Sequence, residues 1–131
     1  PGRPDEVPHG NGEMILVIED DADVRALAVR MLQSLGYKTF EVSDGIGAET
    51  LLANGVKPDL VLSDVVLPGG TSGPQFAEAA RARDPDIRIV FMSGYSDEVA
   101  RQNGFLGSDS VLLNKPFQRR QLAQAVHDAL G

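Results

Sequence analysis

The sequence predicts a doubly wound α/β fold, with one parallel sheet covered by helices on both faces. Short apolar runs alternate with stretches of helical periodicity, which is the pattern of right-handed βαβ units. Two of these runs, Met14–Ile18 and Leu60–Leu62, are wholly apolar, as expected of strands that are buried on both faces. Acidic residues follow both runs, at the end of the strand where open α/β sheets bind their ligands.

Composition limits the possible classes of protein. The chain has 131 residues, which is about one domain, and no cysteine, which excludes disulfides, thiolate catalysis and cysteine-bearing zinc sites. Twelve basic residues against nineteen acidic ones give a net charge of 12 − 19 = −7, which argues against nucleic-acid binding. No apolar run approaches the roughly 20 residues of a membrane span. We therefore expect a cytoplasmic domain that contacts neither nucleic acid nor membrane.

The first half of the chain predicts a linker followed by two strand–helix pairs. Residues 1–13 are rich in proline and glycine and predict a flexible linker or a cloning remnant. Strands are expected at Met14–Ile18 and Lys38–Val42, with a short helix at Ile46–Ala53. Between the two strands, an apolar stripe at helical spacing predicts a helix that ends at Gly36. The inward residues of this stripe are Val24, Leu27, Ala28, Met31, Leu32 and Leu35.

The second half continues the alternation of strands and helices. The predicted elements, in order, are a strand from Leu60 that ends near Asp64, a helix at Pro74–Arg83, a strand at Arg88–Met92, a short helix at Asp97–Gln102, a strand at Val111–Leu113 and a last helix from Gln118. Five strands in such an arrangement favour the flavodoxin-like order 2-1-3-4-5, with its switch point between the first and third strands.

The residues that follow the strands should meet at one edge of this sheet, although they are far apart in sequence. They are three carboxylates, one hydroxyl and one amine, namely Glu19, Asp20, Asp64, Ser93 and Lys115. Crowded carboxylates are costly unless a cation neutralises them, and oxygen ligands suit Mg²⁺. An ionised aspartate can attack a phosphoryl group, whose remaining oxygens a lysine and a serine can bind. The set therefore predicts a metal and phosphorylation of Asp64.

From Met14 to Leu130 the chain resembles a response-regulator receiver domain of two-component signalling, so we expect residues 14–131 to form such a domain. The resemblance implies that Asp64 is the phosphoacceptor, that Lys115 binds phosphate and that Ser93 is the switch hydroxyl. The metal ligands that it implies are Glu19, Asp20, Asp64 and the main-chain carbonyl of Val66, around Mg²⁺ or, as an alternative, Mn²⁺. It also implies a cis peptide bond before Pro116.

The resemblance further implies a phosphohistidine donor, on a histidine kinase or a histidine phosphotransfer domain. The domain itself would catalyse its phosphorylation and dephosphorylation. The stretches around Asp64 and Ser93 look most like receivers fused to bacterial sensor histidine kinases, which predicts a hybrid kinase as the parent chain, with the domain in the cytoplasm or tethered there to a membrane-bound sensor. A stand-alone single-domain response regulator is the alternative. A weak homodimer is left open.

Two other functions are less well supported by the residues. An aspartate-nucleophile phosphohydrolase of the haloacid type requires a second Asp two residues after the nucleophile, and that position is Val66. A degenerate receiver that acts only as a scaffold is disfavoured because all five functional positions are filled. One departure from the family is Leu112, which stands where many relatives have an aromatic switch residue. We therefore expect the response to phosphorylation in the glycine-rich segment Gly94 to Asp109.

Overall fold

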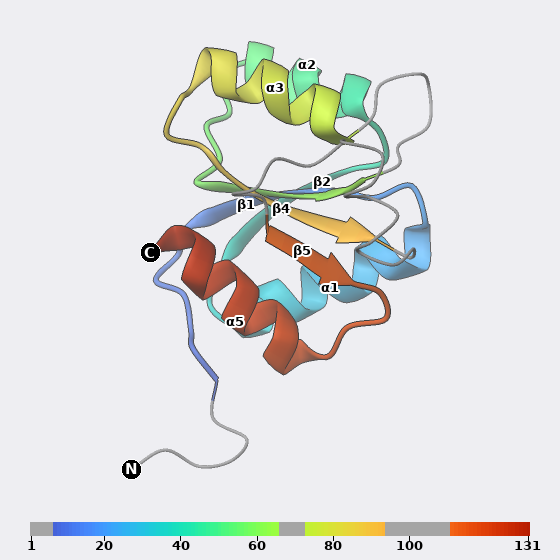
Figure 1. Cartoon of the computed structure of the whole chain (residues 1–131), viewed down its shortest axis with the longest axis vertical. Coiled ribbons are helices and arrows are strands. Elements are labelled where there is room, and N and C mark those ends of the chain that lie inside the picture. Colours follow the sequence, from blue (N-terminus) through green and yellow to red (C-terminus); the bar gives the residue numbers. More distant parts are fainter. Residues whose placement is uncertain (1–6, 66–72, 94–110) are drawn as a thin grey trace.

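The computed structural model describes residues 7–65, 73–93 and 111–131. Its five strands form one parallel sheet in the order β2-β1-β3-β4-β5, so the predicted topology is confirmed (Figure 1). The strands are β1 (Met14–Ile18), β2 (Lys38–Val42), β3 (Leu60–Asp64), β4 (Arg88–Ser93) and β5 (Val111–Asn114). The helices of the described residues are α1 (Ala22–Ser34), α2 (Gly45–Ala53), α3 (Gly73–Arg83) and α5 (Arg119–Leu130).

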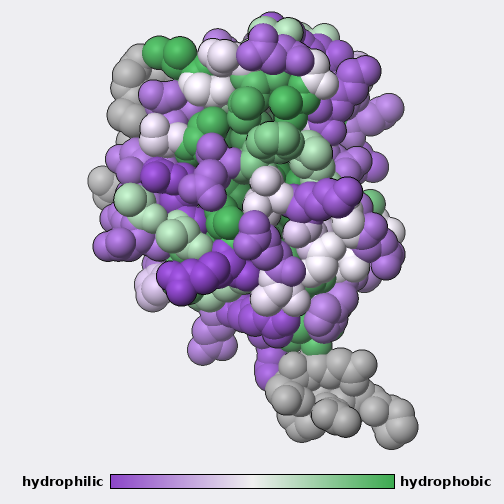
Figure 2. Space-filling model, turned by 180° about the vertical axis from the view of Figure 1, so that it is seen from behind, coloured by the Kyte–Doolittle hydropathy of each residue, from purple (hydrophilic) through white to green (hydrophobic). Residues whose placement is uncertain are grey.

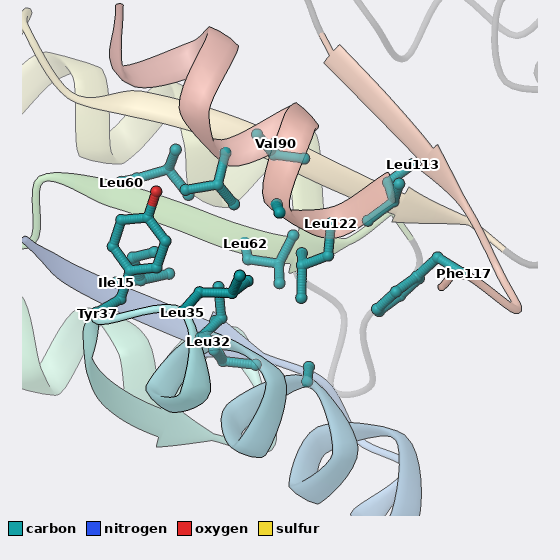
Figure 3. Packing of buried hydrophobic residues seen from close by; sticks show 14 of the residues in the cluster. Ile15, Leu32, Leu35, Tyr37, Leu60, Leu62, Val90, Leu113, Phe117 and Leu122 are labelled. Carbon is teal, nitrogen blue, oxygen red and sulfur yellow. The ribbon is translucent and has the colours of Figure 1, made fainter. Parts of the chain in front are cut away.

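The helices cover both faces of the sheet. In Figure 1, α1 and α5 lie on one side and α2 and α3 on the other, and each pair is in contact. Each face has its own hydrophobic cluster, as alternate residues of a buried strand point to opposite sides. Ile15 and Leu62 meet Leu32 of α1 and Leu122 of α5 on the first face (Figure 3). The two clusters together bury the central strands β1, β3 and β4 on both faces of the sheet.

Helix ends follow from the sequence. The carboxylate of Asp21 caps α1 by accepting hydrogen bonds from the backbone N–H groups of Asp23 and Val24, at 2.9 and 3.1 Å. After Leu35 the chain turns at Gly36, whose φ of 95° is open to glycine at little cost. Asp44 caps α2 in the same way, through the backbone N–H of Gly47 at 2.7 Å. The two caps therefore start α1 a few residues after the end of β1, and α2 a few residues after the end of β2.

The predicted apolar face of α1 is partly wrong. Ala28 and Leu32 are buried as expected, but Leu27 is 46% exposed, and Val29, outside the predicted stripe, is buried. The reason is that α1 contacts α5 as well as the sheet, so its buried face is broader than a single stripe and centred differently.

Apolar surface remains on the side seen from behind, where Figure 2 shows a band of apolar atoms among hydrophilic ones. In the described parts of the chain, three large apolar side chains are exposed: Leu27, Phe40 and Ile46. Phe40 lies on β2, which is at the edge of the sheet that the described residues form and pairs there with β1. This position explains why β2 is less buried than the central strands.

Residues 7–13 pack on the domain, which differs from the free linker expected there. The N–H of Gly10 donates to the carbonyl of Leu35 at 2.6 Å, and that of Gly12 donates to the carbonyl of Gly36 at 2.9 Å. Val7 joins the α1/α5 cluster. The linker expectation overlooked these main-chain bonds because composition does not reveal them.

Two further expectations concern a short helix and membrane-spanning segments. The short helix predicted at Asp97–Gln102 lies outside the described residues. Within the described ranges, no helix is long and apolar enough to cross a membrane.

Candidate functional site

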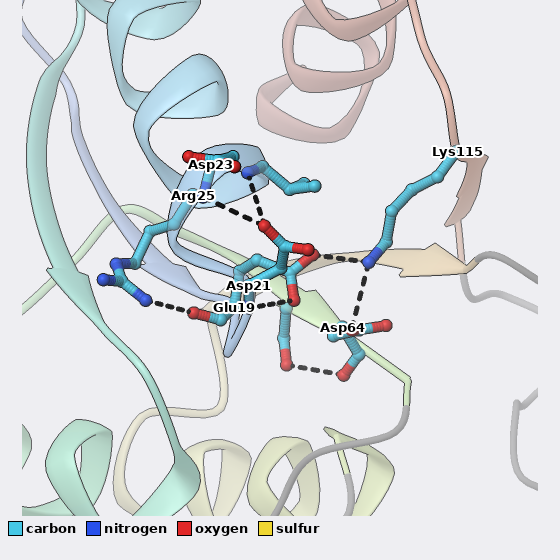
Figure 4. A network of polar contacts seen from close by, with 8 residues as sticks. Glu19, Asp21, Asp23, Arg25, Asp64 and Lys115 are labelled. Atoms are coloured by element: carbon cyan, nitrogen blue, oxygen red, sulfur yellow. Dashed lines mark hydrogen bonds and ion pairs between the residues drawn. The ribbon is translucent and has the colours of Figure 1, made fainter.

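The carboxyl edge of the sheet carries the predicted residues. Glu19 follows β1, Asp64 ends β3, Ser93 ends β4 and Lys115 follows β5, so parallel topology brings all four to the same edge. Asp20 follows Glu19 and is exposed to solvent. Figure 4 shows Glu19, Asp64 and Lys115 turned toward one another.

Three carboxylates form a cluster at this edge. One carboxylate oxygen from each of Glu19, Asp20 and Asp64 lies within 4.8 Å of the other two. The side chain of Glu19 is fully buried and that of Asp64 is only 13% exposed. A set of three oxygen donors on a partly buried edge fits a hard divalent cation. The fourth predicted ligand, the carbonyl of Val66, lies outside the described residues.

Lys115 neutralises part of this negative charge. Its Nζ donates to Asp64 Oδ2 at 3.1 Å and also to Glu19 Oε1. Burial alone would lower the pKa of Lys115, but the hydrogen bonds and the charges of Glu19 and Asp64 outweigh burial and raise that pKa above its usual value. Lys115 is therefore a cation whose ammonium group is held between Glu19 and Asp64.

The backbone around Lys115 is tied to the neighbouring strand. Its N–H donates to the carbonyl of Ser93 at 2.8 Å, which joins the ends of β4 and β5. The peptide bond between Lys115 and Pro116 is cis, as the resemblance implied. Ser93 is buried at this edge. Leu112 is partly buried and packs on the α2/α3 cluster, whereas Gly94 to Asp109, the expected switch segment, lies outside the described residues and stays a prediction.

The main chain at Asp64 is held from two directions. The hydroxyl of Ser63 donates to the carbonyl of Asp64 at 2.9 Å, and the N–H of Gly73 donates to the carbonyl of Val65 at 2.9 Å. A Cβ at Gly73 would lie 2.2 Å from the carbonyl oxygen of Asp64, so only glycine allows α3 to begin this close. Sequence reasoning missed Ser63 and Gly73, because neither contact follows from a motif.

A third missed residue is Arg25, in the first turns of α1. Its Nη1 donates to the carbonyl oxygen of Glu19 at 2.8 Å, and its Nε lies 3.5 Å from Oε1 of Glu41 on β2 (Figure 4 shows the first contact). The N–H of Asp21 also donates to Glu19, at Oε2 and 3.4 Å. The signal in the sequence that could have identified Arg25 was its position as a basic residue one helical turn after Asp21, the cap of α1.

A doubly wound parallel sheet with a carboxylate cluster at the switch point between β1 and β3 is the architecture of α/β proteins that bind their ligands at the carboxyl edge of the sheet. The sequence model of the response regulator receiver domain family matches residues 15–127 of this chain. The chain belongs to this family and is a receiver domain of two-component systems.

Curated relatives include proteins of very different length. The chain is 37% identical over 117 residues to the sensor kinase CckA of Brucella abortus, covering 88% of this chain but only 12% of that kinase. It is 32% identical to the response regulator receiver protein CpdR of the same organism, covering 88% of this chain and 95% of CpdR. The receiver is thus a small part of the first relative and nearly all of the second.

Solved structures agree with this assignment. A response regulator receiver protein from Sinorhizobium medicae has a TM-score of 0.81 and 33% identity, covering 91% of this chain and 94% of that one. The response regulator TrrA of Thermotoga maritima, in complex with Mg²⁺-BeF, has a TM-score of 0.78 and 27% identity, covering 89% and 98%. Both structures match about nine-tenths of this chain in fold, and both are described as response regulators.

Proposed function

We propose that this domain accepts a phosphoryl group on Asp64 from a phosphohistidine and that Mg²⁺ supports the transfer. The observation that carries the proposal is the contact of the Lys115 ammonium with both Glu19 and Asp64, beside a cluster of three carboxylates, in a chain that belongs to the receiver family. The Thermotoga relative, which binds Mg²⁺-BeF, supports the choice of metal.

Asp64 is the nucleophile in this proposal. One carboxylate oxygen attacks the phosphorus, the bond between phosphorus and the imidazole nitrogen breaks, and the imidazole leaves. The bonds of Ser63 and Gly73 to the carbonyls of Asp64 and Val65 hold the main chain from which the carboxylate projects. The product is an acyl phosphate on a partly buried side chain.

The remaining residues handle charge. Glu19, Asp20 and Asp64, with the carbonyl of Val66, would hold the metal, which neutralises the carboxylates and the incoming phosphoryl oxygens. Lys115 can transfer one of its donated hydrogen bonds from Asp64 to a phosphoryl oxygen, because its Nζ already lies 3.1 Å from the attacking carboxylate. We assign the Ser93 hydroxyl as the second donor to the phosphoryl group.

The parent chain in this proposal is a hybrid sensor histidine kinase with a cytoplasmic receiver. Supporting it is the 37% identity to CckA, compared with 32% to CpdR. A single-domain response regulator is the alternative, since the chain spans 95% of CpdR. Incubating the phosphorylated domain with purified histidine phosphotransfer domains tests the parentage. Onward transfer of the phosphoryl group from Asp64 to a phosphotransfer domain is expected of a hybrid receiver, and its absence favours the single-domain response regulator.

Intact-mass measurement tests the chemistry. The domain is incubated with a small acyl phosphate, with Mg²⁺, with Mn²⁺ or with a chelator. One phosphoryl adduct that depends on the metal and is absent from Asp64→Asn supports the proposal. Asp86→Asn is the matched control, because Asp86 lies before β4 at the other edge of the sheet. Rapid turnover of the donor without an adduct would indicate a phosphohydrolase, and an adduct on folded Asp64→Asn would refute the assignment.

A further inference from the structure

A metal site requires groups that orient its ligands as well as the ligands themselves. Asp20 follows directly after Glu19, and the peptide bond between them sets the direction in which the Asp20 side chain leaves the backbone. The carbonyl of Glu19 belongs to this peptide group. Any group that fixes that carbonyl therefore also orients Asp20 relative to Glu19 and Asp64.

Arg25 fixes it with a charged donor. The Nη1 of Arg25 lies 2.8 Å from the carbonyl oxygen of Glu19, which is the short distance of a charge-assisted hydrogen bond. The backbone N–H of the same residue donates to the carbonyl of Asp21 at 2.9 Å, which is the first hydrogen bond of α1, so the side chain reaches back to Glu19 from a fixed first turn. The side chain of Arg25 is only 21% exposed.

A role limited to surface stability explains these contacts less well. The other partner of Arg25 is Glu41, whose side chain is 50% exposed and whose Oε1 lies 3.5 Å from Nε. Such half-exposed pairs contribute little to folding. The shorter contact is to the carbonyl at the metal cluster, and of the two it is the one that bears on ligand geometry.

Relying on the proposed function, we infer that Arg25 is a positioning residue for the metal site: it holds the Glu19–Asp20 peptide in the orientation that lets Glu19, Asp20 and Asp64 bind one divalent cation. It does so without occupying a ligand position, and its positive charge, which alone would repel the cation, is partly offset by Glu41. Partners that orient metal ligands typically change metal affinity by about 10–100-fold when they are removed. We expect a loss of about tenfold for Arg25→Ala, because the three carboxylates themselves remain.

Titration with Mg²⁺, followed by calorimetry or by backbone amide NMR, measures this effect directly. The variants are Arg25→Ala and Arg25→Lys, and the matched control is Glu41→Gln, which removes the ion pair but leaves the guanidinium on the Glu19 carbonyl. We expect the dissociation constant for Mg²⁺ to rise about tenfold in Arg25→Ala, to rise less in Arg25→Lys, which keeps one donor, and to stay unchanged in Glu41→Gln.

Phosphorylation kinetics give the second measurement. The Mg²⁺ concentration for half-maximal phosphorylation should rise in Arg25→Ala while the rate at saturating Mg²⁺ stays near that of the wild type. Thermal unfolding in a chelator checks the fold, and Arg25→Lys carries the test if the alanine variant does not fold.

The outcomes separate the inference from the proposed function. Unchanged Mg²⁺ affinity in the arginine variants, an equal loss in Glu41→Gln, or a lower plateau rate with unchanged half-saturation would overturn the role of Arg25 alone. A wild-type domain that binds no Mg²⁺ would overturn the proposed function, and this inference with it.

Discussion

Neutralising Asp20 should stabilise the metal-free domain. The oxygens of Asp20, Glu19 and Asp64 lie within 4.8 Å of one another, and two like charges at that distance repel by about 0.9 kcal/mol in surroundings as polar as water. Asp20 is exposed and has two such neighbours, so its repulsion totals about 2 kcal/mol before the attraction of Lys115 and screening by salt reduce it. We expect Asp20→Asn to gain about 1 kcal/mol without metal, a rise in melting temperature of roughly 4 °C.

Magnesium should reverse this order. At 100 times the dissociation constant, a bound ion stabilises the wild type by about 2.7 kcal/mol, whereas Asp20→Asn lacks one ligand and should gain much less. The assay is thermal unfolding at low ionic strength, in a chelator and then in excess Mg²⁺. Asp23→Asn is the matched control. It removes the same charge from the first turn of α1, where an acid is favourable, so it should lose stability slightly in both conditions. The reasoning is refuted if Asp20→Asn is destabilised in the chelator as Asp23→Asn is, or if Mg²⁺ stabilises wild type and Asp20→Asn equally.

Three further changes test other parts of the site and the core. Lys115→Ala should cost the metal-free domain about 3 kcal/mol in chemical denaturation, because the fully buried carboxylate of Glu19 loses its cation; an unchanged denaturation midpoint would contradict that pairing. Gly73→Ala should slow phosphorylation by the small donor, because its methyl group would meet the main-chain carbonyl of the phosphoacceptor at 2.2 Å; wild-type kinetics would show that α3 can shift at no cost. Leu32→Ala should cost about 2–5 kcal/mol and Leu27→Ala less than about 1 kcal/mol, because Leu32 is fully buried and Leu27 is half-exposed; similar losses in the two would restore the predicted stripe of α1.

The strand ends could be predicted because their rule depends only on topology. Once five apolar runs alternate with helices, parallel pairing brings Glu19, Asp64 and Lys115 to one edge, whatever the details of packing. Arg25 and Gly73 could not be predicted in this way. The role of Arg25 depends on the path of one long side chain back across a turn, and that of Gly73 on how closely α3 approaches β3.

The same limit applies to the helix faces and to the first residues. Periodicity gives the direction of an apolar stripe, but the width of the buried face depends on which elements pack beside the helix. On α1, Leu27 of the predicted stripe is therefore exposed, and Val29 outside the stripe is buried. Residues 7–13 contain few apolar side chains, and much of their attachment comes from main-chain hydrogen bonds, which the composition of a segment does not reveal.

The attachment of residues 7–13 leaves the edge of the sheet that carries Asp64 uncovered by this segment. Gly10 and Gly12 bond to the turn between α1 and β2, at the edge where the strands begin, and Asp64 lies at the edge where they end. Gly10 also fits against the ring of Tyr37 so closely that a side chain there would overlap it. Residues 7–13 therefore lie at the edge of the sheet opposite to Asp64. A kinase or phosphotransfer partner can approach Asp64 without competing with this segment for space.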